Sequence, residues 1–92
     1  MKSVRKELVQ RGYNYRYAGT GYLEMAVYSA ASRLAGPRPM LTKEVYPMIA
    51  RLAETTPAAV ERSIRSVVHR VEPGRTAGDV IYDVAVGLGH ED

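Results

Sequence analysis

The chain of 92 residues contains no cysteine, no tryptophan and no phenylalanine. Without cysteine it can form neither a disulfide bond nor a thiolate metal site. It also lacks any apolar run near the roughly 18 residues that a transmembrane helix needs, and no signal-peptide pattern opens it. These absences exclude a disulfide-stabilised or membrane-spanning protein and favour a cytoplasmic one.

What is present is typical of a small globular domain. Hydrophobic residues make up 46% of the chain and charged residues 25%, which is ordinary for a soluble protein. A chain of 92 residues can bury one modest core without a bound metal. We therefore expect residues 1–92 to form a single domain.

Positive charge is concentrated in the larger, N-terminal part of the chain. Residues 1–75 hold all 13 Lys and Arg against six Glu, a net charge of +7. Residues 76–92 hold four acidic residues and no Lys or Arg, a net charge of −4. Ten of the 13 basic residues are arginine, the side chain best shaped for bidentate contact with phosphate or guanine. The pattern favours a nucleic-acid-binding protein, although a solvated basic surface would have the same composition.

Residues 57–71 predict an amphipathic helix. Thr56 can cap its N-terminus with the side-chain hydroxyl, and Pro57 suits the first helical position, where a backbone N–H has no partner. One face is aliphatic at helical spacing and comprises Val60, Ile64, Val67, Val68 and Val71. The opposite face is polar and carries Arg62, Arg65, Ser66 and His69, with Glu61 at its flank. Such a helix packs on one side and is free to bind on the other.

A shorter helix is expected to begin near Thr42 and to precede this one. Pro47 lies about one turn into it and removes a backbone hydrogen bond, so the helix start should be distorted or shifted toward the proline. Its predicted apolar face consists of Val45, Met48, Ile49 and Leu52. The connection of residues 54–56 has the length of the turn in a helix-turn-helix, without the glycine often found there. Residues 42–71 therefore predict a helix-turn-helix.

Two helices are expected before this pair. The first should lie between a cap at Ser3 and a stop at Gly12. Its apolar stripe comprises Val4, Leu8 and Val9. The second should begin at Thr20 or Gly21 and end at Leu34 or Ala35, before a turn rich in glycine and proline. Its apolar face comprises Leu23, Ala26, Val27, Ala30, Ala31 and Leu34.

One more helix is expected near the C-terminus. A capping box of Thr76 and Asp79 opens it, and it continues to about Leu88. Its apolar face comprises Val80, Ile81, Val84, Ala85 and Leu88. The expected fold class is all-α, a compact bundle of about five helices that contains the helix-turn-helix.

Residues 13–17, Tyr-Asn-Tyr-Arg-Tyr, alternate aromatic and polar side chains between the first two helices. A lone strand would have no partner, so the segment is expected to be an extended connector. Interleaved basic and aromatic residues can bind single-stranded nucleic acid. Tyrosines more often cover the edge of a core, and we favour this second interpretation.

The sequence offers no convergent set of catalytic groups. Its two histidines are His69, on the polar face of the predicted helix 57–71, and His90, close to the end of the chain. Gly-Thr-Gly at 19–21 lacks the spacing and the preceding strand of a nucleotide-binding loop. Asp79 and Asp83 have no third ligand nearby, so they favour a solvated helix face over a metal site. We expect neither an enzyme nor a bound metal or cofactor.

The segment LTKEVYPMIARLAETTPAAVERSIRSVV, residues 41–68, resembles the DNA-binding effector domain of the stage-zero sporulation protein A family of response regulators. The most specific parts are YPMIA at 46–50, Thr-Thr at 55–56 and VERSIR at 60–65. The similarity also reaches back to residues 21–23 and forward to the last helix. It implies an all-helical transcriptional regulator of sporulation that binds double-stranded DNA at a box with a TGNCGAA-like core, here through a recognition helix at residues 57–71.

The resemblance also implies which side chains contact DNA. By position in the family motif, Glu61, Arg62 and Arg65 face the bases. Arginine pairs with O6 and N7 of guanine, and a Glu carboxylate accepts from the amino group of cytosine. Polar residues around them are expected to contact the DNA backbone: Lys43, Arg51, Thr56, Ser63, Ser66, His69 and Arg70. From the residues alone, Glu61 and Arg65 would equally suit a surface ion pair at i, i+4 spacing.

The chain departs from the family pattern at three DNA-facing positions and in one connection. Ala58 and Ala59 replace Ser and Arg, Ser66 replaces His, and the short helix that follows the recognition helix in the family is missing. That region of the family has been linked to RNA polymerase, the protein partner that the resemblance implies. Two bound half-sites would favour pairing of two copies on DNA. The departures leave open an alternative function: a protein-interaction module or antagonist that keeps the fold without specific DNA binding.

Overall fold

The computed structural model describes residues 3–32 and 40–89. These residues form five α-helices and one π-helical turn: α1 (Val4–Arg11), α2 (Ala18–Ala31), η1 (Leu41–Val45), α3 (Tyr46–Ala53), α4 (Pro57–Val71) and α5 (Ala77–Gly89). Neither of the two described ranges contains a β-strand. The prediction of an all-α helical bundle is confirmed.

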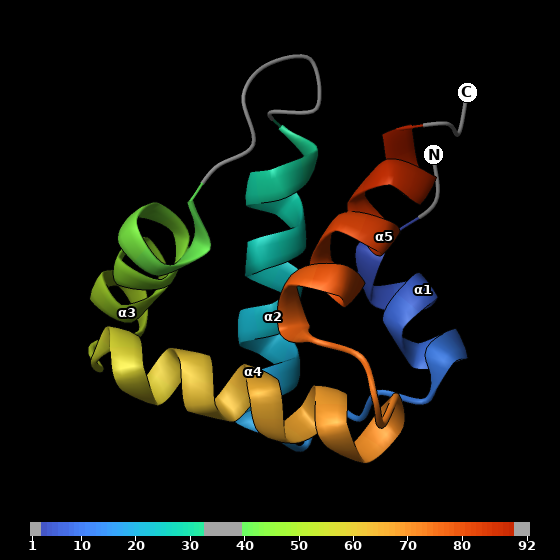
Figure 1. Ribbon diagram of the computed structural model, residues 1–92, viewed down its shortest axis with the longest axis horizontal. Helices are drawn as coiled ribbons and strands as arrows, with labels where there is room; N and C mark the ends of the chain where they lie inside the picture. Colours follow the sequence, from blue (N-terminus) through green and yellow to red (C-terminus); the bar gives the residue numbers. More distant parts are fainter. Residues whose placement is uncertain (1–2, 33–39, 90–92) are drawn as a thin grey trace.

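Helix α2 is the centre of the arrangement (Figure 1). Helices α1, α3, α4 and α5 all pack against it. The turn η1 and α3 lie on one side of α2, α1 and α5 lie on the other, and α4 crosses its lower end. The core residues of α2 are at most 1% exposed: Leu23, Ala26, Val27 and Ala30. Two of these are alanines, which let neighbouring helices approach closely.

A close approach joins the first turn of α2 to the middle of α4. At Gly19, a Cβ atom would overlap the backbone carbonyl group of Ser63 and come within 3.1 Å of Val67 Cγ1. Only a residue without a side chain fits between the two backbones. Gly19 is buried, and this contact fixes where α4 crosses α2.

The ends of α1 form as predicted, but its buried face is narrower. Ser3 caps the first turn through its hydroxyl oxygen, and Gly12 ends the helix in the left-handed conformation with φ 106°. Val4 and Leu8 are buried, whereas Val9 is 54% exposed. The prediction for Val9 was wrong because so short a helix turns only its i, i+4 pair toward the core, and Val9 lies about 100° further round the axis.

Helix α2 begins earlier than predicted, at Ala18 rather than at Thr20 or Gly21. The hydroxyl of Thr20 does not cap the helix, because it donates to the backbone carbonyl of Asn14 at 2.8 Å. Thr20 is therefore buried within the first turn and anchors the connector before it. The predicted end of this helix, with Leu34, lies outside the described residues.

Pro47 shifts the start of the next helix, as expected. The turn η1 precedes the helix, and α3 begins at Tyr46 with the proline in its first turn. The prediction for Leu52 was wrong, because Leu52 is 67% exposed, whereas Tyr46 and Ala50 are 4% and 2% exposed. A π-helical turn is wider than an α-helical one and changes the rotation of the residues that follow it. The buried face of this segment is therefore Val45, Tyr46, Ile49 and Ala50.

Helix α5 follows the prediction. Thr76 Oγ1 accepts a hydrogen bond from Asp79 N at 3.0 Å, and Asp79 Oδ2 accepts one from Thr76 N at 3.2 Å. The capping box is confirmed. The five predicted core residues are all buried: Val80, Ile81, Val84, Ala85 and Leu88.

The connector between α1 and α2 has two kinds of tyrosine. Tyr13 is buried and Tyr15 packs against the core, so the interpretation that these residues cover a core edge is confirmed for them. Tyr17 is 40% exposed. Its side chain is not part of the core and lies on the side of α4.

Candidate nucleic-acid interface

The turn between α3 and α4 is closed by a glutamate in the conformation that glycine usually adopts. Glu54 has φ 56° and ψ 48°, the left-handed region, which normally favours glycine at a helix end. Thr55 then donates its N–H to the carbonyl of Ala50 at 2.9 Å. Residues 54–56 thus connect the helices within the length that a helix-turn-helix uses.

Helix α4 begins and packs as predicted. Thr56 Oγ1 accepts a hydrogen bond from Ala59 N at 3.1 Å, and Pro57 occupies the first turn. The aliphatic face is directed into the core: Val60, Ile64, Val67 and Val68 are buried and Val71 is half-buried. Because this face holds the helix in place, the polar face is directed outward.

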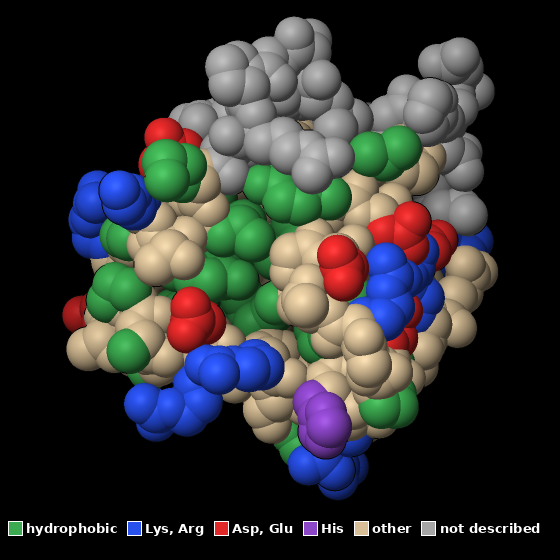
Figure 2. Space-filling model, in the orientation of Figure 1, with side chains coloured by type: hydrophobic (Ala, Val, Ile, Leu, Met, Phe, Trp, Pro, Cys, Tyr) green, Lys and Arg blue, Asp and Glu red, His purple; other side chains and the backbone are tan. Residues whose placement is uncertain are grey.

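The polar face of α4 divides into two rows at i, i+4 spacing. The first row is Glu61, Arg65 and His69, and the second row is Arg62, Ser66 and Arg70. All six residues are exposed except Glu61, which is half-buried. Figure 2 shows Lys and Arg side chains along the lower edge of the molecule, where α4 lies. One helix face therefore brings together all three expected base contacts and three of the expected backbone contacts.

In the first row, Arg65 is paired with Glu61. Arg65 Nη2 lies 3.1 Å from Glu61 Oε1, and the two side chains are 67% and 43% exposed. This is the surface ion pair that the i, i+4 spacing allows. Such a pair contributes about 0.3–0.5 kcal/mol, so either partner can exchange it for another contact at little cost in stability.

Glu61 also lies near a buried tyrosine of α3. Burial raises the pKa of Tyr46, and the negative charge of Glu61 raises it further, whereas the charge of Arg65 lowers it. Tyr46 therefore stays neutral at physiological pH. The Glu61 carboxylate is thus close enough to Tyr46 for its charge to affect the pKa of the phenol.

The second row faces the beginning of α2. A shallow hollow of about 290 Å³ lies between Tyr17 and Gly19 on one side and Arg62 and Ser66 on the other. Arg62 forms no hydrogen bond or ion pair with residues 3–32 or 40–89. Its guanidinium group is therefore available to a ligand.

The remaining expected contacts are spread more widely. Lys43 in η1 and Arg51 in α3 are exposed, outside the two rows of α4. Ser63 is half-buried, with its backbone against Gly19. The hydroxyl oxygen of Thr56 is already the acceptor of the helix cap, although its proton can still be donated to a phosphate.

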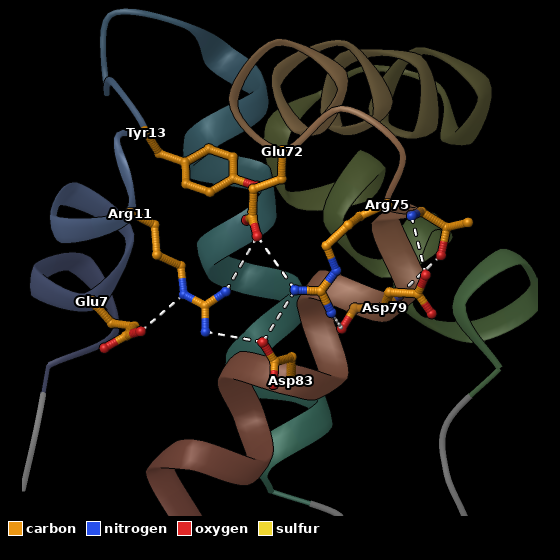
Figure 3. Close-up of polar contacts among 8 residues, drawn as sticks. Glu7, Arg11, Tyr13, Glu72, Arg75, Asp79 and Asp83 are labelled. Carbon is orange, nitrogen blue, oxygen red and sulfur yellow. Dashed lines mark hydrogen bonds and ion pairs between the residues drawn. The ribbon is translucent and has the colours of Figure 1, made fainter.

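An ionic network ties the C-terminal end of α4 to α1 and α5 (Figure 3). Arg11 lies 3.5 Å from Glu72 and 3.1 Å from Asp83. Arg75 lies 3.3 Å from each of the same two carboxylates. Glu7 extends the network at 2.8 Å from Arg11. Two of these pairs have a local spacing, Glu7 with Arg11 at i, i+4 and Glu72 with Arg75 at i, i+3. The others join distant segments, and sequence reasoning predicted none of the network.

A buried tyrosine completes the network. Tyr13 donates its hydroxyl to Glu72 at 2.7 Å. Burial and this hydrogen bond raise the pKa of Tyr13 well above its ordinary value. Hydrogen bonds from Arg11 and Arg75 lower the pKa of Asp83. At neutral pH the network therefore holds a neutral Tyr13 and an ionised Asp83 near the end of α4.

Residues 4–83 match the protein family described as Sporulation initiation factor Spo0A C terminal. The chain belongs to this family. The match covers α1 to α4 and the first half of α5. The family comprises DNA-binding effector domains that act in transcription regulation, so the resemblance seen in residues 41–68 is confirmed. No curated protein matches the chain.

None of the helices α1 to α5 combines the length and the apolar character that crossing a bilayer requires.

Proposed function

We propose that this member of the Spo0A C-terminal family is a sequence-specific, double-stranded DNA-binding transcriptional regulator whose helix α4 reads the major groove. The observation that carries the proposal is the outward polar face of α4, where Arg62 and Arg65 project from a helix whose opposite face is buried. Recognition helices reach base edges in this way, mainly from their N-terminal half. Helices α3 and α4 then act as a helix-turn-helix within one DNA-binding domain.

Base recognition rests on three side chains in this proposal. Arg62 pairs with O6 and N7 of a guanine, and Arg65 does the same after it leaves Glu61. The released Glu61 accepts from the amino group of a cytosine. Each good bidentate pair contributes about 1–3 kcal/mol of discrimination between bases.

Contacts to the DNA backbone fix the register of the helix in the groove. The proposed contacts are Lys43, Arg51, Thr56, Ser63, Ser66, His69 and Arg70. The net charge of +7 over residues 1–75 supports them. Neutralised phosphates release counterions, so the affinity should fall as the salt concentration rises.

Fluorescence anisotropy of the full chain tests this function. One duplex carries a TGNCGAA-like box and the other a scrambled sequence, and both are measured over a salt series. We expect tighter binding to the box and weaker binding to both duplexes at higher salt. Equal affinities for the two duplexes would contradict recognition of this box, and no binding at low salt would contradict DNA binding altogether.

The variant Arg62→Lys separates base reading from charge. Lysine keeps the positive charge but lacks the planar fork of arginine. The preference for the box over the scrambled duplex should therefore fall about tenfold or more, while the salt dependence stays the same. Arg62→Ala should lower both the preference for the box and the salt dependence of the affinity. Arg5→Ala, which removes a charge from α1, serves as the control and should retain the preference.

Regulation would further require partners. We propose that the DNA-bound domain contacts RNA polymerase in the cytoplasm and that two adjacent boxes pair two copies of it. Adding polymerase to the DNA complex tests the first contact. Titrating duplexes with one and two boxes tests the second, since pairing would make binding to two boxes cooperative.

The competing function is a protein-interaction module that keeps the fold without specific DNA binding. Two exposed apolar residues beside the α3–α4 turn favour it: Leu52, which is 67% exposed, and Ala58 in the first turn of α4. A stable complex with a regulator or with polymerase, formed by a chain without affinity for DNA, would support this function instead.

A further inference from the structure

The connector between α1 and α2 lies beside the C-terminal half of α4. Arg70 of α4 stacks over the ring of Tyr17, with its Cζ atom 4.9 Å from the ring centroid. A hollow of about 410 Å³ lies between the connector and α4, lined by Asn14 and Tyr17 on one side and by Arg70 on the other. An exposed arginine of the second row is thus held by a residue from a distant part of the sequence.

Tyr17 differs from the other two tyrosines of the connector. Tyr13 and Tyr15 donate hydrogen bonds to glutamate side chains and lie in or against the core. Tyr17 is 40% exposed, and its hydroxyl bonds to no residue in the described ranges. It also borders the hollow that contains Arg62 and Ser66. Its ring therefore extends the second row of α4 rather than the core.

Arg16 stands next to Tyr17 in the same tight turn. The backbone N–H of Arg16 donates to the side chain of Asn14 at 2.8 Å, and the N–H of Tyr17 donates to the Asn14 carbonyl at 3.2 Å. The side chain of Arg16 is exposed and has no hydrogen bond or ion pair within residues 3–32 and 40–89. The same turn therefore carries Arg16 next to Tyr17, the residue that stacks on Arg70.

A second arginine–tyrosine stack in the molecule has a different electrostatic setting. Arg5 Cζ lies 4.6 Å from the ring centroid of Tyr15. Arg5 also lies 3.6 Å from Glu24, which accepts the hydroxyl of Tyr15 as well. Its charge is balanced within the fold, whereas no carboxylate in the described part of the chain pairs with Arg70. An arginine that is oriented and unbalanced is suited to an anionic ligand.

We propose that Arg16, Tyr17 and Arg70 form a second DNA-contact site, the connector site, which binds the sugar–phosphate backbone beside the groove that α4 reads. The inference rests on the proposed function. Arg70 follows Arg62 by eight residues, which is about 12 Å along a helix, and the major groove is about 12 Å wide. When Arg62 reaches the base edges, Arg70 lies near a bordering strand. Phosphate oxygens then accept from both guanidinium groups and from the Tyr17 hydroxyl.

The test measures how the affinity of the full chain depends on salt, with a box duplex and a scrambled duplex of equal length. Each neutralised phosphate contributes about 0.9 to the slope of log affinity against log salt. Arg16→Ala should reduce this slope by about 1 and weaken binding to both duplexes equally, so the preference for the box is unchanged. Tyr17→Ala should weaken binding in the same sequence-independent way. A duplex trimmed to the box should bind the wild type more weakly than the full duplex does, and on this trimmed duplex Arg16→Ala should weaken binding no further.

Arg5→Ala is the matched control, because it removes one charge and the equivalent stack but leaves the connector site intact. A slope unchanged by Arg5→Ala but reduced by Arg16→Ala supports the connector site. If the Arg5 and Arg16 variants have equal slopes, the connector site is overturned. The proposed function still stands in that case, provided that the wild type binds the box in a salt-dependent way. A wild type that binds no DNA overturns both. If circular dichroism shows that Tyr17→Ala is unfolded, Tyr17→Phe keeps the ring and tests the hydroxyl alone.

Discussion

A single absent side chain, at Gly19, sets the distance between α2 and α4. The variant Gly19→Ala places a methyl group against the Ser63 backbone, and overpacking of this kind costs about 1–3 kcal/mol. We expect the free energy of unfolding in urea to fall by that amount. Gly21, in the same helix, has open space around its Cβ position, so Gly21→Ala should instead stabilise the protein by about 0.5–1 kcal/mol. A Gly19→Ala variant that is as stable as the wild type, or more stable, would contradict the close approach.

A second residue-scale prediction concerns the charge of Glu61. The variant Glu61→Gln removes a carboxylate from the outward face of α4 and releases Arg65 from its ion pair at 3.1 Å. Binding to a scrambled duplex should become tighter, because phosphates no longer face a negative charge there. Discrimination at the base pair proposed to contact Glu61 should fall, because the amide accepts less strongly than the carboxylate. Fluorescence anisotropy measures both effects with three duplexes: the box, the box mutated at one cytosine, and the scrambled sequence. If Glu61→Gln bound the scrambled duplex more weakly than the wild type does, DNA contact by this face would be contradicted.

At the scale of elements, the α3–α4 turn stores strain in Glu54. A residue with a side chain pays about 1–2 kcal/mol in the left-handed conformation, and Glu54 has φ 56°. Glu54→Gly should therefore raise the free energy of unfolding by about 0.6–1 kcal/mol, once about 0.4–1 kcal/mol for the added freedom of the unfolded chain is subtracted from the relieved strain. Glu54→Ala keeps the Cβ atom and should leave the stability nearly unchanged. Thermal and urea unfolding of both variants would show the difference, and equal stabilities would contradict it.

Local signals predicted the helices well because caps and periodicity act within a few residues. The caps at Ser3, Thr56 and Thr76 all form, and the aliphatic face of α4 is buried as expected. Val9 and Leu52 were placed wrongly, because neither the width of a two-turn face nor the rotation caused by a π-turn can be read from apolar spacing.

The part of the candidate site that depends on local sequence was predictable, as the helices were. The two rows of α4 follow from helical periodicity and the family motif. Tyr17 could not be connected with α4, because Arg70 is far from it in the sequence and only tertiary packing brings the two together. The choice of Gly19 has the same origin, since its reason lies in Ser63. Contacts between distant segments have no periodic signature.

At the scale of the whole molecule, the ionic network makes stability depend on pH. Hydrogen bonds from Arg11 and then Arg75 lower the pKa of Asp83 in the fold. Asp83 therefore stabilises the fold above its unfolded pKa of about 3.9, and this contribution is lost as the pH falls through the lower, folded value. Asp83→Asn should be less stable than the wild type at neutral pH, with a difference that shrinks under acid. Urea unfolding over a pH series measures it, and a difference independent of pH would contradict the role of the charge.

The opposed faces of α4 have a consequence for how such regulators diverge. The residues that build the core point inward, and positions such as Ala58, Arg62 and Ser66 point to solvent, so exchanges among the outward positions leave the fold intact. Surface substitutions of this kind usually change stability by less than about 0.5 kcal/mol. After gene duplication, the exposed face of α4 in one copy can therefore change through a few outward substitutions while both copies keep a common architecture. Selection therefore acts on the two faces of α4 separately: the buried face is conserved and the exposed face changes.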